Sequence, residues 1–380
     1  MTYLDNAATS YPKPEGVYRA MDNFNRQMGG NPGRGASRWT MTSNSIVSET
    51  REALASLFNI SDSTRIAFCL NITEALNTGL KGILKPGDHV ITTSMEHNAV
   101  ARPLMALQQR GVEWSAVNCG SDGSLDPDDI RCAIRHNTRM ICMLHASNVT
   151  GTIMPIRDVG MIAKEHDLLF MVDSAQTAGL LSLDVEEYCI DLLAFTGHKG
   201  LLGPQGTGGL YVRPGIKIEP LKEGGTGSLS EELAQPQFMP DHLESGTPNT
   251  PGIAGLGAGL DFLHSVGLEN IRNHEKRLTE VLIRGLQEID RVVVYGPIEA
   301  DQRTAVVSFN IEGVDCGEVS LKLDHEYGIV TRSGLHCAPL AHRTIGTLIQ
   351  GSCRLSPGYF STEEDIEKTI QAVYRIACRG

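Results

Sequence analysis

The 380-residue chain lacks the features that would direct it to a membrane, a nucleic acid or an export pathway. No stretch approaches the roughly 18 consecutive apolar residues of a membrane span. Basic residues do not cluster among aromatics, and a formal net charge of −12 disfavours a polyanionic partner. The first residues have neither the basic segment nor the apolar core of a secretion signal. We therefore expect a cytoplasmic protein that binds neither membrane nor nucleic acid.

Paired cysteines are also missing. The nine cysteines are odd in number and scattered, and none forms a CxxC pair, so they predict no disulfide framework. Without an export signal, a reducing compartment is expected. Cys142 and His145 have a CxxH spacing, but no second ligand pair answers it, so we expect no metal site.

The chain is too long for one ordinary core, which favours two domains, one of them large. Strands are expected at 65–70, 88–93, 113–117, 140–145, 168–173 and 192–195. A helix is expected at 44–58, before the first strand, and further helices between the strands at 98–110, 126–136 and 155–166. This alternation predicts βαβ units and a mostly parallel sheet. A long helical stretch over about 252–289 and a separate α+β tail are expected to follow.

Four reactive side chains stand just after predicted strands: His97, Asn148, Asp173 and Lys199. In a parallel sheet, ligands bind at the carboxyl ends of the strands. We therefore expect these residues to share one site.

Asp173 and Lys199 supply what pyridoxal 5'-phosphate (PLP) chemistry requires. The lysine forms a Schiff base, and the carboxylate keeps the pyridine nitrogen protonated. Gly197 and Gly200, on either side of His198 and Lys199, allow close approach of the cofactor. A solvated lysine and a turn aspartate are the alternatives for isolated residues of these types.

The segment Asn71–Ala75 is the candidate phosphate site, with Thr73 expected to cap a helix whose N–H groups and dipole favour an anion. Thr196 and His198 could add donors. His97 could be a surface histidine, or its ring could stack on the pyridine and move protons.

A second decisive segment is Thr331–Pro339. Cys337 lies there in a Gly- and Pro-punctuated loop with Arg332 and His336 close in sequence, and positive neighbours favour a reactive thiolate. Further on, Arg354 is either a surface charge beside a strand or a bidentate ligand of a substrate carboxylate.

These motifs together resemble the class V aminotransferase family, and within it the cysteine desulfurases and selenocysteine lyases. The resemblance covers essentially the whole chain, and the short cysteine loop resembles the group II, Suf-type enzymes. The matching segments are Tyr3–Thr9, Asn71–Ala75, Glu96–Asn98, His145–Gly151, Asp173–Gln176, Gly197–Lys199, Glu244–Pro248, Arg332–Ala338 and Arg354.

The resemblance implies an α/β, fold-type-I PLP-dependent transferase. Residues 15–262 would form a large PLP-binding domain with a mostly parallel seven-stranded sheet. Residues 1–14 and 263–380 would form a smaller α+β domain that carries the catalytic cysteine loop. A homodimer with active sites at the subunit interface is also implied.

Individual roles follow from the same resemblance. Lys199 would be the Schiff-base lysine, Asp173 the partner of the pyridine nitrogen, Gln176 the contact of O3', and His97 the stacking ring. The remaining expected site residues are Thr73, Glu74, Thr196 and His198 on the phosphate side of the cofactor, Thr247 from the partner subunit, Asn148 and Arg354 for the substrate carboxylate, and Cys337 as sulfur acceptor.

The expected reaction converts L-cysteine to L-alanine, leaves a persulfide on Cys337 and passes sulfur to an acceptor protein, as in iron–sulfur cluster assembly. A selenocysteine lyase, with L-selenocysteine as substrate, or a cysteine-sulfinate desulfinase would need the thiolate less. An ordinary aminotransferase or epimerase would have no use for Cys337. A non-catalytic sulfur carrier is a further alternative, which the intact Lys199, Asp173, His97 and Arg354 disfavour.

Overall fold

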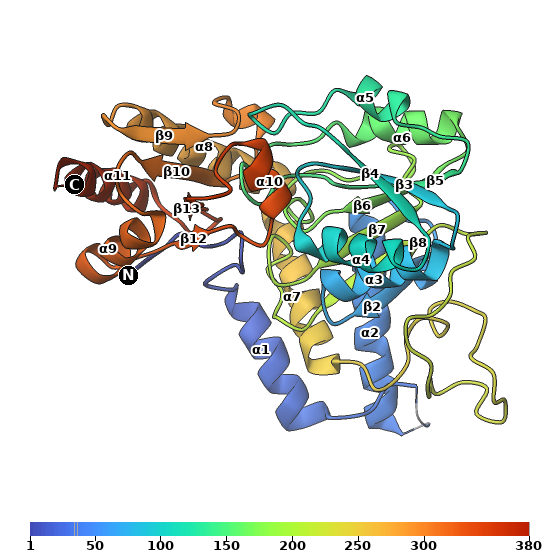
Figure 1. The fold of residues 1–380 in the computed structure, drawn as a ribbon. Coiled ribbons are helices and arrows are strands. Elements are labelled where there is room, and N and C mark those ends of the chain that lie inside the picture. The colour runs from blue at the N-terminus through green and yellow to red at the C-terminus, as the bar shows by residue number, and fades with distance from the viewer. Residues whose placement is uncertain (34, 36, 380) are drawn as a thin grey trace.

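The computed structural model describes residues 1–33, 35 and 37–379, and each of its two lobes contains its own sheet (Figure 1). The strands of the larger sheet are β2 (Ile66–Cys69), β3 (His89–Thr93), β4 (Glu113–Val117), β5 (Thr138–Leu144), β6 (Leu169–Asp173), β7 (Leu192–Thr196) and β8 (Gly208–Val212). They are ordered β2-β8-β7-β6-β5-β3-β4, and β8 alone runs against its neighbours. The predicted α/β fold with a mostly parallel seven-stranded sheet is confirmed.

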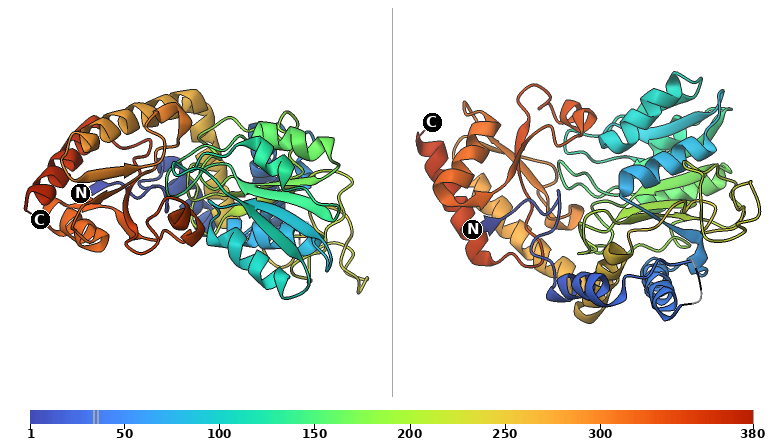
Figure 2. Two further views of the ribbon diagram at one scale, coloured as in Figure 1. Left: turned by 45° about the horizontal axis from the view of Figure 1, so that its top comes forward. Right: turned by 90° about the horizontal axis from the view of Figure 1, so that it is seen from below.

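Helices cover both faces of this sheet, as the left view of Figure 2 shows. The helices of this lobe are α1 (Glu15–Asn23), which continues as a π-helical turn Phe24–Met28, α2 (Arg38–Leu57), a 3₁₀ turn Ser63–Arg65, α3 (Ile72–Ile83), α4 (Asn98–Gln108), α5 (Pro127–Cys132), α6 (Ile156–Glu165) and α7 (Thr250–Val266).

Alternation along the strands decides which helices meet each face. Leu192 and Ala194 of β7 are buried with the apolar side chains of α3 and α4. Leu193 and Phe195 are buried on the opposite face with those of α2, α6 and α7. A strand buried on both faces reads as a continuous apolar run, which is why these strands could be recognised in the sequence.

The predicted long helical stretch over about 252–289 is helical but interrupted. The segment forms two helices, α7 and α8 (Leu268–Gln287), separated by Gly267. Gly267 has a φ of 85°, a conformation that glycine adopts without a side-chain penalty and that ends a helix. The apolar pattern continues across this break, so periodicity alone concealed it.

The smaller lobe contains both ends of the chain (Figure 1). Its elements are β1 (Thr2–Tyr3), β9 (Val292–Tyr295), a 3₁₀ turn Ala300–Gln302, β10 (Val307–Ile311), α9 (Cys316–Tyr327), β11 (Ile329–Val330), β12 (Arg332–Gly334), α10 (Pro339–Thr344), β13 (Ser352–Leu355) and α11 (Glu363–Arg379). An antiparallel sheet β12-β13-β10-β9 packs with α8, α9 and α11, while β1 pairs with β11 in parallel.

The described residues form three buried apolar clusters, one on each face of the large sheet and one in the smaller lobe. One core of the larger lobe includes Leu263 and Ile271 and also takes in Ala338, Ala341 and Ile345 from the segment that follows the cysteine loop. The core of the smaller lobe includes Leu4 together with Leu278 and Phe309. The division into 15–262 and 1–14 plus 263–380 stays a prediction.

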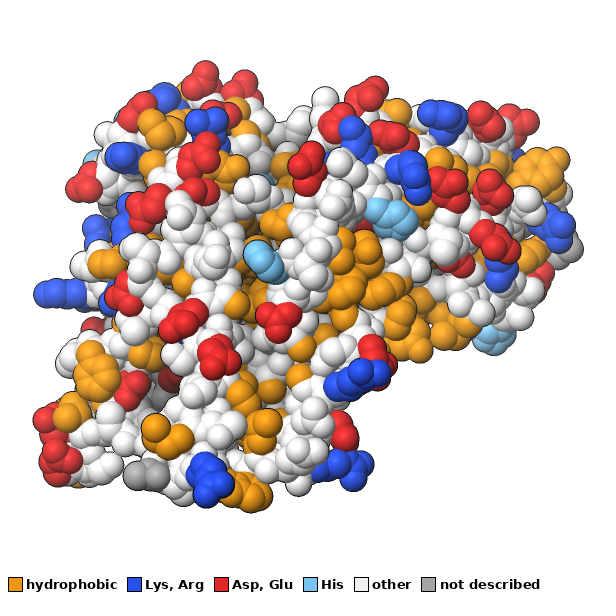
Figure 3. All heavy atoms as spheres, turned by 180° about the vertical axis from the view of Figure 1, so that it is seen from behind, with side chains coloured by type: hydrophobic (Ala, Val, Ile, Leu, Met, Phe, Trp, Pro, Cys, Tyr) orange, Lys and Arg blue, Asp and Glu red, His pale blue; other side chains and the backbone are white. Residues whose placement is uncertain are grey.

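The surface mixes acidic and basic side chains, and apolar side chains gather along the notch between the lobes (Figure 3). Within the described residues, no helix is long and apolar enough to cross a membrane.

We expect Leu282→Ala to lower the free energy of unfolding of the smaller lobe by about 2–5 kcal/mol, because Leu282 is fully buried in α8 and its removal leaves a cavity. Leu321→Ala is the matched control, since Leu321 is 56% exposed, and should change stability by less than about 0.5 kcal/mol. Denaturant unfolding measures both. Equal losses would contradict the core assignment.

Candidate active site

The site is formed where the smaller lobe meets the large sheet at the carboxyl ends of its parallel strands. Strands β3, β5, β6 and β7 are parallel, so the loops that follow them emerge at the same edge. The Asn98 N–H donates to the Cys337 carbonyl over 2.8 Å, and the Asn148 Nδ2 group donates to the His336 carbonyl over 2.8 Å. These bonds join the cysteine loop to the loops after β3 and β5.

Asp173 is the last residue of β6, and Lys199 lies in the turn that follows the neighbouring strand β7. Asp173 is 5% exposed and accepts a hydrogen bond from the Ala175 N–H over 2.9 Å. Burial raises the pKa of Asp173, which the Ala175 bond and the charge of Lys199 oppose. Burial also lowers the pKa of Lys199 to about 8, against the attraction of Asp173. The lysine can therefore exchange a proton near neutral pH.

His97 caps α4 and is held in one orientation. Its Nδ1 atom accepts a hydrogen bond from the Ala99 N–H over 3.0 Å, so the proton of the neutral ring is assigned to Nε2. Burial and the positive charges of Lys199 and Arg332 lower the pKa of His97 to about 4. The ring is therefore neutral at physiological pH.

The N-terminus of α3 contributes Thr73 to the same surface hollow as His97. The residue that caps this helix differs from the expected one. The predicted Thr73 cap is wrong, because Asn71 caps the helix by accepting from the Glu74 N–H over 3.0 Å. Thr73 is the second helical residue, and its side chain is exposed. The Glu74 carboxylate accepts from the Leu70 N–H over 2.6 Å and pairs with Lys222.

Thr196 is the last residue of β7 and His198 follows it in the lysine loop, and both are expected on the phosphate side of the cofactor. The Nδ1 atom of His198 is buried and, within the described chain, has no hydrogen-bond partner. Thr196 is 1% exposed, and its hydroxyl donates to the Thr207 carbonyl over a long 3.4 Å. Burial, aided by Lys199 and Lys13, lowers the pKa of His198 to about 4.

Arg354 is buried in β13 and connects three distant parts of the chain. It is 1% exposed, and its Nη2 group donates to Asp5 Oδ1 over 2.6 Å. Its Nη1 group donates to the Asn148 carbonyl over 3.0 Å. Arg354 Nε and Asn148 Oδ1 are both buried and unpartnered among the described residues. The unpaired Nε donor on a fixed guanidinium suits a carboxylate ligand, while Asn148 Oδ1 is an unpaired acceptor.

Cys337 is exposed at the mouth of the site, while most other cysteines are covered. The Arg332 Nη2 group donates to Cys337 Sγ over 3.4 Å. The thiol lines a surface hollow together with Thr73, His97 and Arg102. This arrangement brings Cys337 to the stacking-ring candidate and the candidate phosphate helix.

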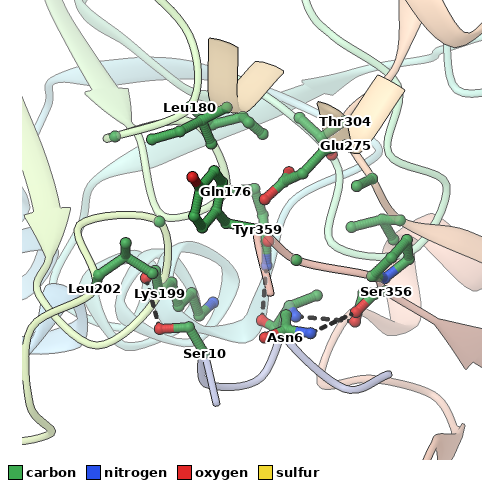
Figure 4. A pocket seen from close by; sticks show the side chains of 18 of the residues that line it. Asn6, Ser10, Gln176, Leu180, Lys199, Leu202, Glu275, Thr304, Ser356 and Tyr359 are labelled. Carbon is green, nitrogen blue, oxygen red and sulfur yellow. Dashed lines mark hydrogen bonds between the residues drawn. The ribbon is translucent and has the colours of Figure 1, made fainter. Parts of the chain in front are cut away.

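A cavity at the notch between the lobes lies on the other side of the lysine loop. Figure 4 shows Gln176 and Lys199 beside it, with Thr304, Ser356 and Tyr359 from the smaller lobe opposite. Gln176 donates to the Ala7 carbonyl over 3.1 Å.

Within one chain, the structure gathers most predicted site residues but not Thr247. Thr247 is exposed and lines a different hollow, with Leu70 and Glu74. Sequence reasoning missed Asp5 as the partner of Arg354 and His342 behind the cysteine loop. Asp5 lies in the opening motif, yet nothing local signals a partner 349 residues away.

The groups at this edge fit PLP. A buried carboxylate suits a pyridinium, a neutral imidazole suits stacking, and a free helix N-terminus with the orphan His198 Nδ1 suits a phosphate. Among the described residues, no group of three or more His, Cys, Asp or Glu side chains could hold a metal ion.

Comparisons with known proteins agree with this chemistry. The family model "Aminotransferase class-V" matches residues 2–369. A "Probable cysteine desulfurase" of Methanothermobacter thermautotrophicus is 36% identical, over 100% of this chain and 95% of that protein. "Cysteine desulfurase IscS" of Dictyoglomus turgidum is 32% identical, over 98% and 94%. The apo structure of a cysteine desulfurase from Thermococcus onnurineus superposes with a TM-score of 0.94 at 32% identity, covering 100% of this chain and 95% of that one.

We expect the His97 ring to show no titration between pH 5.5 and 8.5 in the folded apo-protein, because burial and its positive neighbours hold its pKa at about 4. The same ring in the urea-unfolded chain should titrate near the ordinary value of about 6.5. Histidine NMR shifts against pH, assigned with His97→Gln, measure this. A folded-state midpoint near 6.5 would contradict the described environment.

Proposed function

Because the chain belongs to the class V aminotransferase family, whose members depend on PLP, we propose that it is a PLP-dependent cysteine desulfurase. It converts L-cysteine to L-alanine and transfers the sulfur to Cys337. The observation that carries this proposal is the exposed Cys337 thiol, held 3.4 Å from Arg332 in the same hollow as His97 and Thr73. Transamination has no need of a thiol there.

The bound cofactor supplies an electron sink for the carbanion formed at the substrate Cα. We propose that Lys199 holds it covalently, Asp173 pairs with its ring nitrogen, His97 stacks on the ring and Gln176 contacts O3'. Thr73, Thr196 and His198 would hold the phosphate, joined by the partner subunit's Thr247. Glu74 is also proposed to contact the cofactor, and its carboxylate supports the start of α3 through Leu70 and Lys222.

Arg354 and Asn148 are proposed to bind the carboxylate of L-cysteine. The guanidinium is already fixed by Asp5 and by the Asn148 carbonyl, so little side-chain entropy remains to be lost when substrate binds. The unpartnered Arg354 Nε supplies a donor for this carboxylate.

Lys199 and Cys337 divide the chemistry. Lys199, whose pKa is lowered to about 8, accepts the Cα proton once its amine is released. The Cys337 thiolate, beside the positive Arg332, then attacks the substrate sulfur. The Sγ–S bond forms as the substrate Cβ–S bond breaks and its electron pair returns to carbon. A proton delivered to Cβ and the return of a proton to Cα from Lys199 give alanine, and the sulfur remains on Cys337 as a persulfide.

We further propose a homodimer, a sulfur-acceptor protein and a reducing, cytoplasmic location with a role in iron–sulfur cluster assembly. Leu70 is 54% exposed and lines the hollow that contains Thr247, which suits burial against a second subunit. All nine cysteines are free, as a reducing compartment requires. The exposure of Cys337 gives an acceptor thiol access to the persulfide.

Cys337→Ala should retain the visible absorbance of the bound cofactor but release alanine from L-cysteine at least about 10²-fold more slowly, because no thiol remains to accept sulfur. Cys132→Ala, which also removes an exposed thiol, is the control and should match wild type. Cysteine sulfinate loses its sulfur group without a nucleophile, so its turnover should fall far less. Undiminished desulfuration by Cys337→Ala would refute Cys337 as sulfur acceptor.

Lys199→Ala should abolish the absorbance of covalently held cofactor and lower turnover by at least about 10³-fold. Borohydride reduction followed by peptide mapping should attach the cofactor to Lys199 in wild type and to no residue in the variant. Lys164→Ala, at the opposite edge of the sheet, should behave as wild type. Cofactor found on another lysine in wild type would overturn this assignment.

A further inference from the structure

A chain of buried polar side chains lies directly behind the cysteine loop. His336 is 2% exposed and His342 is 0% exposed, and their rings are stacked with centroids 5.4 Å apart. His336 Nδ1 lies 3.2 Å from His342 Nε2, and His342 Nδ1 lies 2.7 Å from Thr347 Oγ1. At the other end, His336 Nε2 lies 3.3 Å from the Arg332 carbonyl.

The hydrogen positions in this chain follow from its fixed end. The Arg332 carbonyl can only accept, so His336 Nε2 donates and, in a neutral ring, His336 Nδ1 accepts. His342 Nε2 must then donate to His336, which leaves His342 Nδ1 to accept from the Thr347 hydroxyl. Burial lowers the pKa of His336 to about 2 and that of His342 to about 4, so both rings are neutral. The Arg332 carbonyl therefore sets the direction of every bond in the chain, and the Thr347 hydroxyl supplies the donor that the buried end of the chain needs.

The cysteine loop needs such support because its backbone is strained. His336 has a φ of 50° and Cys337 a φ of 57°, in the left-handed region that side chains other than glycine rarely adopt. Such residues persist only where their surroundings hold them. Asn148 and Asn98 hold the His336 and Cys337 carbonyls, and the His342–Thr347 pair holds the His336 side chain.

We propose that His342 and Thr347 are positioning residues, which fix the left-handed His336–Cys337 turn and thereby aim Cys337 Sγ at the substrate sulfur. This inference rests on the proposed desulfurase function. Neither residue lines the hollow in which Cys337 lies, so each acts through His336. A packed apolar pair could fill the same space, but it would leave His336 Nδ1 and the orientation of its ring unspecified.

Thr347→Val removes the hydroxyl donor and keeps the shape of the side chain, while Thr347→Ser keeps the hydroxyl. In the holoenzyme, Thr347→Val should lower kcat for alanine formation from L-cysteine by about 10-fold to 100-fold, the usual effect of a misplaced reacting group. The KM and the visible cofactor spectrum should not change, and Thr347→Ser should restore kcat. His342→Phe and His342→Gln form a second pair. His342→Phe should lower kcat as Thr347→Val does, and His342→Gln should retain kcat because the glutamine amide can still donate to His336.

Two further readouts separate positioning from general support. Turnover of cysteine sulfinate should be unchanged in Thr347→Val, because that reaction needs no attack by Cys337. Amide hydrogen exchange at residues 335–338 should become faster in Thr347→Val and not in Thr347→Ser, whether or not cofactor is bound.

The proposal is overturned if Thr347→Val has wild-type kcat and exchange, or if both substrates are slowed equally. It is also overturned if Thr347→Ser fails to rescue; should Thr347→Val not fold, the His342→Gln and His342→Phe pair decides by the same criteria. Undiminished desulfuration of L-cysteine by Cys337→Ala would instead refute the proposed function. The two failures are therefore distinguishable.

Discussion

The buried guanidinium of Arg354 is the interaction on which the assembled site depends. An arginine that is 1% exposed must have its charge and its N–H groups satisfied within the protein. Asp5 at the start of the chain and Asn148 after β5 satisfy its charge and its Nη2 and Nη1 groups, while Nε has no partner among the described residues. They can do so only when the smaller lobe lies against the carboxyl ends of the parallel strands. The same docking brings the cysteine loop to Asn98, beside His97. Fold stability and site assembly therefore rest on one contact region.

This placement also separates two chemical tasks in space. The large sheet carries Asp173 and Lys199 on the rigid ends of adjacent strands, where burial tunes their pKa values. The smaller lobe carries Cys337 on a strained and exposed loop, where a partner thiol can reach it. In the proposed mechanism, electron withdrawal would thus take place in a buried environment and sulfur release at the surface, and the interface between the lobes would bring the two together.

Sequence reasoning succeeded where the signal is local. The strands that precede Asp173 and Lys199 are apolar runs buried on both faces, and parallel topology then places their ends together. It failed where a single backbone angle decides, as at Gly267, whose φ of 85° splits the predicted long helical stretch. It also chose Thr73 over Asn71 as the cap, since either residue type can cap a helix. The bonds from Arg354 to Asp5 and from His336 to His342 depend on tertiary structure, which no spacing rule encodes.

The central claim is that sulfur from L-cysteine comes to rest on Cys337. Mass spectrometry of the holoenzyme after one turnover, with the exposed thiols alkylated and the peptides mapped, tests this most directly. We predict one added sulfur atom on the Cys337 peptide and one equivalent of alanine, with none on the exposed Cys132 or Cys378. Alanine formed with sulfur on another cysteine, or on none, would contradict the account.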